Sequence, residues 1–210
     1  MEDLYEVCGT PTVLRFLLKE GLVDGFGITV TGKDIKENIE SLPDLSAGQE
    51  ILQPVSKPIK PTDHLQILRG SLAAGGAVGK ITGKEGTTFT AKTPSLSSAT
   101  RAPRAGLGHD FALVTDGRFS GGSHGFVVGH VVPEAIERGP IGLVRDGDTI
   151  TIDAEKNVMG VVDVSEAEMA ERRKAWKAPP GRYSKRTLKK YAAVVSDASQ
   201  GCITDRVIKT

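Results

Sequence analysis

Residues 111–130 constrain the fold more than any other segment, because they place two apolar runs on either side of a long polar, glycine-dense connection. The first run, residues 111–115, has the length and composition of a buried strand, and the second begins at Phe126. A tight turn needs only two or three residues, whereas this connection has about ten. Because glycine lets backbone N–H groups approach a ligand closely, we expect a functional site here, at the mouth of two strands.

The polar side chains of this connection are the candidate site residues. They are Asp116, Arg118, Ser120, Ser123 and His124. A serine in a glycine-rich turn is usually structural, so the residue types alone do not make Ser120 catalytic. His124 and His130 lie on either side of an expected strand, which argues against a metal ion bound by both.

Short β-type runs follow one another from residue 65 to residue 164, and the chain contains 25 glycines. This pattern favours a turn-rich β architecture with flanking helices. The expected strands are residues 65–68, 77–81, 88–91, 111–115, 126–128, 141–144, 149–152 and 158–164. The expected helices are residues 10–21, 33–41, 165–176 and 188–195. Ser165 and Glu168 have the spacing of a capping box at the start of the third helix.

The composition of the chain predicts three parts. Residues 1–43 contain two of the expected helices and a short strand candidate over residues 28–30. Prolines at positions 43, 54, 58 and 61 predict an extended linker over residues 44–63. Residues 64–210 are the expected C-terminal β-rich domain. Within it, residues 92–108 show no hydrophobic period and predict a mobile surface loop.

The composition also argues against several classes of protein. A formal net charge of +1 provides no electrostatic reason to bind nucleic acid or an acidic membrane. No apolar run approaches the roughly 20 residues that span a bilayer, and the acidic first residues do not fit a signal or transit peptide. Cys8 and Cys202 make no metal-ligand spacing. Asp146, Asp148 and Asp153 lack the spacing of a calcium loop, so we expect a solvated hairpin there.

Several motifs resemble one known family. Residues 115–130 read Thr-Asp-Gly-Arg-Phe-Ser-Gly-Gly-Ser-His-Gly-Phe-Val-Val-Gly-His. They are similar to a signature near the C-terminus of dihydroxy-acid dehydratases, which belong with the sugar-acid and phosphogluconate dehydratases. Residues 29–33, 68–73 and 76–86 resemble further motifs in the family's order. The resemblance covers only the C-terminal part of such an enzyme. It implies an α+β fold: a β-barrel-like, swivelling β/β/α domain flanked by helices and preceded by a short helical extension that ends the N-terminal domain.

The resemblance breaks at residues 92–108. Members of the family carry a few dozen further residues there, including a Glu-Gly-Pro segment that supplies a carboxylate to a catalytic magnesium ion. This chain has no such segment. The internal segment is therefore shortened.

The resemblance implies a chemistry for the signature. In the family, a serine alkoxide removes the C2 proton of a dihydroxy acid, with magnesium and an iron–sulfur cluster as Lewis acids. By position, that catalytic serine is Ser120. Gly121, Gly122 and Ser123 would bind substrate, whereas Asp116 and Arg118 would support the loop. The cluster cysteines and the other magnesium ligands belong to the N-terminal domain, so no metal site is expected in this chain.

The resemblance favours a function in which the complete enzyme dehydrates 2,3-dihydroxy-3-methylbutanoate and its methylpentanoate homologue to 2-keto acids. These reactions serve valine, isoleucine and coenzyme A precursor synthesis. The chain alone is expected to be inactive, and the complete enzyme is expected to be a homodimer. The expected location is a mitochondrion or plastid in a eukaryote and the cytoplasm in a bacterium. Two alternatives stay open: a sugar-acid or phosphogluconate dehydratase domain, and a non-catalytic folding or dimerisation module.

Overall fold

The computed structural model describes residues 2–81, 86–93, 111–123, 125–181 and 183–205. The chain forms two compact units, Met1–Thr62 and Asp63–Thr210. The boundary between them falls at the end of the proline-containing segment. Among the described helices, none has the length and apolar composition needed to cross a membrane.

The first unit contains the helices α1 (Glu2–Glu6), α2 (Gly9–Lys19) and α3 (Ile35–Ile39). Helix α2 ends near the expected glycine, because Gly21 adopts a φ of 71° and donates to Leu18 O. Helix α3 is shorter than expected, because Asp34 is its N-cap and accepts from Glu37 N at 2.7 Å. The strand expected at residues 28–30 is reduced to a single bridge between Ile28 and Asp34.

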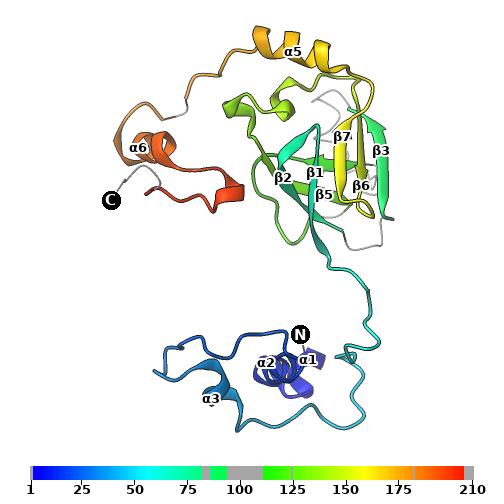
Figure 1. Cartoon of the computed structure of the whole chain (residues 1–210), viewed down its shortest axis with the longest axis vertical. Helices are drawn as coiled ribbons and strands as arrows, with labels where there is room; N and C mark the ends of the chain where they lie inside the picture. Colours follow the sequence, from blue (N-terminus) through cyan, green and yellow to red (C-terminus); the bar gives the residue numbers. More distant parts are fainter. Residues whose placement is uncertain (1, 82–85, 94–110, 124, 182, 206–210) are drawn as a thin grey trace. The chain divides into compact units, whose positions relative to one another are not determined.

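The second unit is built on a mixed sheet in which the described residues supply seven strands (Figure 1). The strands are β1 (Leu65–Gly70), β2 (Ala73–Lys80), β3 (Thr88–Lys92), β4 (Ala112–Val114), β5 (Phe126–Val132), β6 (Thr149–Asp153) and β7 (Val158–Val161). Their order across the sheet is β3-β6-β7-β1-β2-β5-β4. Neighbouring strands are antiparallel, except that β1 is parallel to β7 and β4 is parallel to β5.

The sheet curls so that the edge strand β3 approaches β5, the strand next to the opposite edge, across the interior. Phe89 lies on the edge strand β3 and Phe126 on β5, yet their ring centroids are 5.3 Å apart. The core inside this curl consists of buried side chains from most strands. Its largest members include Leu68, Ile152 and Met159. The architecture is therefore α+β with a nearly barrel-shaped sheet, which confirms the expected fold class.

One expected strand is wrong. Residues 140–143 form the 3₁₀ helix η3 (Pro140–Leu143). Pro140 is its first residue, and because proline has no backbone N–H it cannot donate to a strand ladder. Ile141 and Val144 still pack against the core, and Leu143 is buried. The apolar run thus correctly predicted that these residues are buried, but it wrongly predicted a strand conformation. The other strands expected in the second unit are present with shifted ends.

Short helices complete the second unit: η2 (Ala135–Glu137), α5 (Glu166–Ala175), α6 (Arg186–Val194) and η4 (Ala198–Gln200). The loop expected over residues 92–108 begins later than predicted. Lys92 still pairs with Thr149 of β6, and Thr93 N donates to Asp148 O at 2.8 Å. The remainder of that loop, residues 94–108, lies outside the described residues.

Candidate functional site

The candidate site is the connection between β4 and β5, residues 115–125. These two strands are neighbours and parallel, with Leu113 opposite Val127, so the connection must cross from one end of the pair to the other. Its first residues stay close to β5. Thr115 N donates to Val128 O at 2.9 Å, and Thr115 O accepts from Val131 N at 3.2 Å. The start of the connection is thereby fixed to the sheet.

A backbone irregularity in β5 makes room for this attachment. The register between β2 and β5 shifts between Gly76 and Val78, and His130 on β5 adopts a φ of 52°. A non-glycine residue in this left-handed region is uncommon. In this conformation His130 N donates to Gly117 O at 2.9 Å. The bulge therefore directs a β5 amide toward the connection instead of toward the neighbouring strand.

Asp116 ties the connection to the next element of the chain. Its Oδ2 atom accepts from Ala135 N, at the start of η2, at 2.8 Å. Arg118 is exposed, and the described part of the chain provides no hydrogen bond or ion pair to it. Of the two residues expected to support the loop, Asp116 thus has a hydrogen bond to the next element, and Arg118 has none among the described residues.

Phe119 packs directly on the backbone of β5. A Cβ atom placed on Gly129 would lie 2.5 and 2.8 Å from two carbon atoms of the Phe119 ring. Only glycine leaves space for the ring at this distance. Gly129 is buried, so the contact fixes the residue that immediately precedes Ser120.

Ser120 begins a four-residue turn that ends at Ser123, which we call the Ser120 turn. Ser123 N donates to Ser120 O at 3.1 Å, which closes the turn. The two hydroxyl oxygens lie 3.5 Å apart. Ser120 is exposed and Ser123 is half-buried, so a ligand has access to both hydroxyls.

Neither the backbone conformation nor the packing of this turn requires its two glycines. Gly121 and Gly122 are absent from the positions with positive φ. A Cβ on Gly121 would meet no described atom within 4 Å, and one on Gly122 would reach only Ser120 Oγ at 3.8 Å. No hydrogen bond among the described residues uses the N–H group of either glycine. Small residues with free amides at an exposed turn are typical of a place where a ligand approaches the backbone.

Lys80 is a site residue to which the sequence reasoning assigned no role. It is the last residue of β2, and its Nζ atom donates to Gly121 O at 2.6 Å and to Ser123 O at 2.8 Å. Its only sequence signal is its position in residues 76–86, one of the motifs that resemble the family. Strand pairing between β2 and β5 brings it to the turn, and sequence spacing does not reveal that pairing.

The described residues offer no donor set for a metal ion or an iron–sulfur cluster. No three of their His, Cys, Asp and Glu side chains are grouped closely enough to hold a metal. Cys8 and Cys202 are both exposed and belong to different units. His124, one of the candidate residues, lies outside the described part of the chain.

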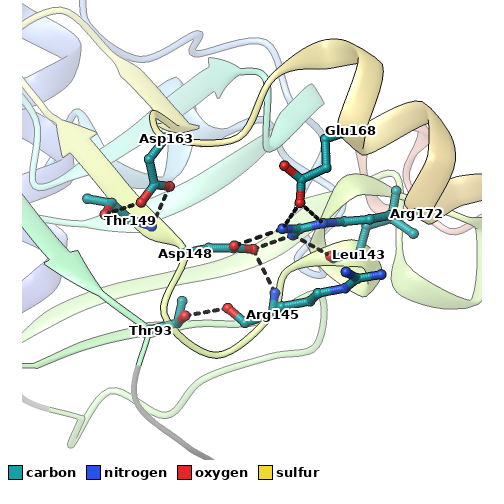
Figure 2. Close-up of polar contacts among 8 residues, drawn as sticks. All are labelled: Thr93, Leu143, Arg145, Asp148, Thr149, Asp163, Glu168 and Arg172. Carbon is teal, nitrogen blue, oxygen red and sulfur yellow. Dashed lines mark hydrogen bonds and ion pairs between the residues drawn. The ribbon is translucent and has the colours of Figure 1, made fainter.

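A second polar cluster joins α5 to the sheet (Figure 2). The guanidinium group of Arg172 donates to Asp148 Oδ2 at 2.5 Å and Oδ1 at 3.0 Å, to Glu168 Oε1 at 2.6 Å, and to Leu143 O at 3.2 Å. Asp148 is only 7% exposed, so the solvated hairpin expected there is wrong for this residue. Its partner lies on a helix that sequence spacing alone does not place beside it.

Hydrogen bonds shift the pKa values of Asp148 and Arg172 in this second cluster. The Arg172 guanidinium that donates to Asp148 holds the pKa of that carboxyl below its usual value of 3.8. The same bonds raise the pKa of Arg172. The Glu168 side chain accepts from Arg172 instead of from the backbone of Ser165. Only half of the expected capping box therefore forms, in which Ser165 Oγ accepts from Glu168 N at 3.2 Å. Every donor of Arg172 and both oxygens of Asp148 serve the fold, so this cluster is structural.

Comparison with known families matches the same region. The model for the C-terminal domain of dihydroxy-acid and 6-phosphogluconate dehydratases matches residues 50–103 and 90–202. The two matched stretches overlap at residues 90–103, where the sequence predicts a shortened segment. This overlap supports the interpretation that family residues are missing there.

Individual relatives carry the same name. The chain is 55% identical to a mitochondrial dihydroxy-acid dehydratase of Penicillium brasilianum, over 98% of the chain and 41% of the relative. It is 46% identical to the mitochondrial dihydroxy-acid dehydratase of Saccharomyces cerevisiae, with 98% and 42% covered. For the dihydroxy-acid dehydratase of Chromohalobacter salexigens the identity is 45%, again with 98% and 42% covered. The chain thus spans about two fifths of the length of the relatives it matches.

Proposed function

Because the chain belongs to the C-terminal domain family of the dihydroxy-acid and 6-phosphogluconate dehydratases, we propose that it supplies the Ser120 turn to a dihydroxy-acid dehydratase. One observation carries the proposal: an exposed serine begins a turn whose two glycines are required neither by their φ angles nor by their neighbours. The relatives named above are dihydroxy-acid dehydratases, which favours this activity over a sugar-acid or phosphogluconate dehydratase. The proposed substrates are 2,3-dihydroxy-3-methylbutanoate and its methylpentanoate homologue.

Ser120 is the proposed base. Its oxygen would take the proton from C2, the electrons of the C2–H bond would form the C2–C3 double bond, and the C3 hydroxyl would leave. The resulting enol becomes the 2-keto acid, so the net change is the loss of one water. A free serine is a very weak base, and it needs a site that stabilises its alkoxide. The free amides of Gly121 and Gly122 and the Ser123 hydroxyl are the groups proposed to contact the bound substrate or the charge on Ser120.

Assistance to the leaving hydroxyl must come from outside the described residues. Members of the family use magnesium and an iron–sulfur cluster, but the described side chains do not fit either group. We therefore route no step through them. We propose that the N-terminal part found in the relatives provides the cluster cysteines and every magnesium ligand except the carboxylate of the Glu-Gly-Pro segment that this chain lacks. The chain alone would then be inactive. We further propose that the second unit is a swivelling β/β/α domain and that the complete enzyme is a homodimer. If the source is a fungus, its location would be the mitochondrion, as the names of the fungal relatives state.

A complementation assay tests the proposal. The chain is produced together with the N-terminal part of the Penicillium brasilianum relative, and 2-keto acid formation from 2,3-dihydroxy-3-methylbutanoate is measured. We expect activity from the pair and none from either part alone. An inactive pair that nevertheless forms a stable complex with bound iron would support the non-catalytic module instead.

The Ser120→Ala substitution tests the base within the same assay. Loss of a general base should lower turnover by at least about 10²–10⁴-fold. Thermal stability should be unchanged, because Ser120 is exposed and the 3.5 Å contact with Ser123 is the one hydrogen bond of its hydroxyl to a described residue. Ser56→Ala is the matched control, because Ser56 is an exposed serine of the first unit, and this variant should retain full activity. If Ser120→Ala keeps more than about a tenth of wild-type turnover, Ser120 is not the base.

A further inference from the structure

Lys80 reaches the Ser120 turn from a different strand, and among the described residues its hydrogen bonds to the turn go to backbone atoms. The lysine lies 41 and 43 residues before the two turn residues that it contacts, and its half-buried side chain donates to the carbonyl oxygens of both. These carbonyls belong to Gly121 and Ser123, the second and fourth residues. One ammonium group therefore links both halves of the turn to the end of β2.

This contact determines which way a neighbouring amide points. A trans peptide group is planar, with its C=O and N–H bonds in opposite directions. Since the carbonyl of Gly121 is directed at Lys80, the N–H of Gly122 in the same peptide group is directed away from Lys80. That N–H has no partner among the described residues. Lys80 thus holds one of the free amides of the turn in a defined direction.

The charge of Lys80 is not neutralised by a described carboxylate. The ion pairs of the described residues involve Lys19, Lys156 and Lys174, but not Lys80. Its hydrogen-bond partners, the two carbonyls, are neutral. A net positive charge therefore remains next to the turn that carries Ser120, where it favours an anion.

We propose that Lys80 is a positioning residue for Ser120. It fixes the Gly121 and Ser123 carbonyls, which aims the Gly122 amide, and it places a cation beside the turn whose first residue, Ser120, would carry the alkoxide. Lys80 acts through the turn and does not touch substrate. This inference rests on the proposed function for its catalytic part, but the ordering of the turn by Lys80 does not depend on it.

Two measurements on the same variants test the inference. In the complementation assay, Lys80→Met should lower kcat by about 10²-fold, as expected when a group that stabilises developing charge is lost, and should change KM by less than a few fold. Lys80→Arg should recover much of the loss, because it keeps the charge and the donors. Lys156→Met, which removes an exposed lysine paired with Asp153, should leave kcat unchanged. In NMR spectra of the chain alone, Lys80→Met should shift or broaden the amide signals of Gly121, Gly122 and Ser123, whereas Lys156→Met should not.

The outcomes separate the two claims. If the wild-type pair is inactive, the proposed function fails, and the NMR spectra still decide whether Lys80 orders the turn: unchanged signals overturn that. If the wild-type pair is active and folded Lys80→Met keeps the wild-type kcat, the inference is overturned while the proposed function stands. Should Lys80→Met not fold, Lys80→Gln replaces it under the same criteria.

Discussion

Gly121 and Gly129 belong to the same segment, but the structure requires their small size for different reasons. A Cβ on Gly129 would overlap the Phe119 ring at 2.5 Å, whereas a Cβ on Gly121 would lie in open space. Gly129 is therefore necessary for packing, and Gly121 is available for close approach of a ligand. This difference distinguishes the glycine that packing requires from the glycine that we propose contacts substrate.

Alanine substitutions at the two glycines should have opposite effects. Gly129→Ala overpacks β5 against Phe119 and should lower the free energy of unfolding by about 1–3 kcal/mol. Gly121→Ala should keep that free energy or raise it by about 0.4–1 kcal/mol, because its φ suits alanine. It should nevertheless reduce turnover in the complementation assay, since the new methyl group faces the proposed substrate. Urea unfolding and turnover of both variants check this. Full activity of Gly121→Ala would contradict a ligand at the turn.

At the scale of elements, α5 is joined to the sheet mainly through one charged side chain. Arg172 is its buried residue, and its guanidinium group contacts the turn before β6 and the end of η3 (Figure 2). The other side chains of α5 are mostly exposed. The position of this helix therefore depends more on hydrogen bonds than on apolar packing.

Arg172→Met should be strongly destabilising. It leaves the buried Asp148 carboxylate without its partner, and breaking a buried pair in this way costs about 3–5 kcal/mol. Lys174→Met on the same helix is the matched control. That lysine pairs with Glu171 through side chains that are 73% and 69% exposed, so its loss should cost only about 0–1 kcal/mol. Urea unfolding of the two variants gives the comparison. Equal decreases in the free energy of unfolding of the two variants would show that water solvates the Asp148–Arg172 pair as it solvates an exposed pair.

The same pair predicts an acid dependence of stability. Because hydrogen bonding to Arg172 lowers the pKa of folded Asp148 below 3.8, the pair stabilises the fold above that pH. This contribution is lost as the pH falls through the lower folded value, where the carboxyl takes up a proton. Asp148→Asn should therefore show a shallower fall in the free energy of unfolding between about pH 5 and pH 2. Asp146→Asn, in an exposed residue of the same turn, should show the wild-type slope. Equal slopes for all three proteins would contradict the prediction.

At the scale of the whole molecule, the two units have separate sets of internal contacts. The core cluster that encloses Leu68, Ile152 and Met159 lies entirely within Asp63–Thr210. The Ser120 turn, Lys80 and the Arg172 cluster belong to that unit as well. The second unit therefore contains its own core and the described contacts that hold the Ser120 turn.

A chain shortened to residues 63–210 should unfold like the complete chain. The single tryptophan, Trp176, lies in the second unit and reports on its unfolding through fluorescence. We expect the urea midpoint of this signal to be the same with and without residues 1–62. A lower midpoint in the shortened chain would show that the first unit stabilises the second.

The sequence by itself determined most of the elements and pointed to the site. Alternating and apolar runs predicted each described strand of the sheet, although residues 141–144 were wrongly expected to be a further strand. The unusual length of the connection before Phe126 marked the turn that carries Ser120. These features are local: a strand pattern or a glycine-dense loop is contained within a few consecutive residues. The motifs also indicated the family that the comparisons then showed.

Only the tertiary structure decided which distant residues meet. Lys80 reaches Gly121 and Ser123 because β2 pairs with β5, and Arg172 reaches Asp148 because α5 packs beside η3 and the turn before β6. Neither pairing leaves a periodic signal, since each depends on strand order and on the path of the chain between elements. The 3₁₀ helix that begins at Pro140 is a further case in which the sequence pattern predicted burial but not conformation. Its apolar residues are buried as predicted, but the proline at its start, which cannot donate to a strand ladder, favoured the helical conformation in which they are buried.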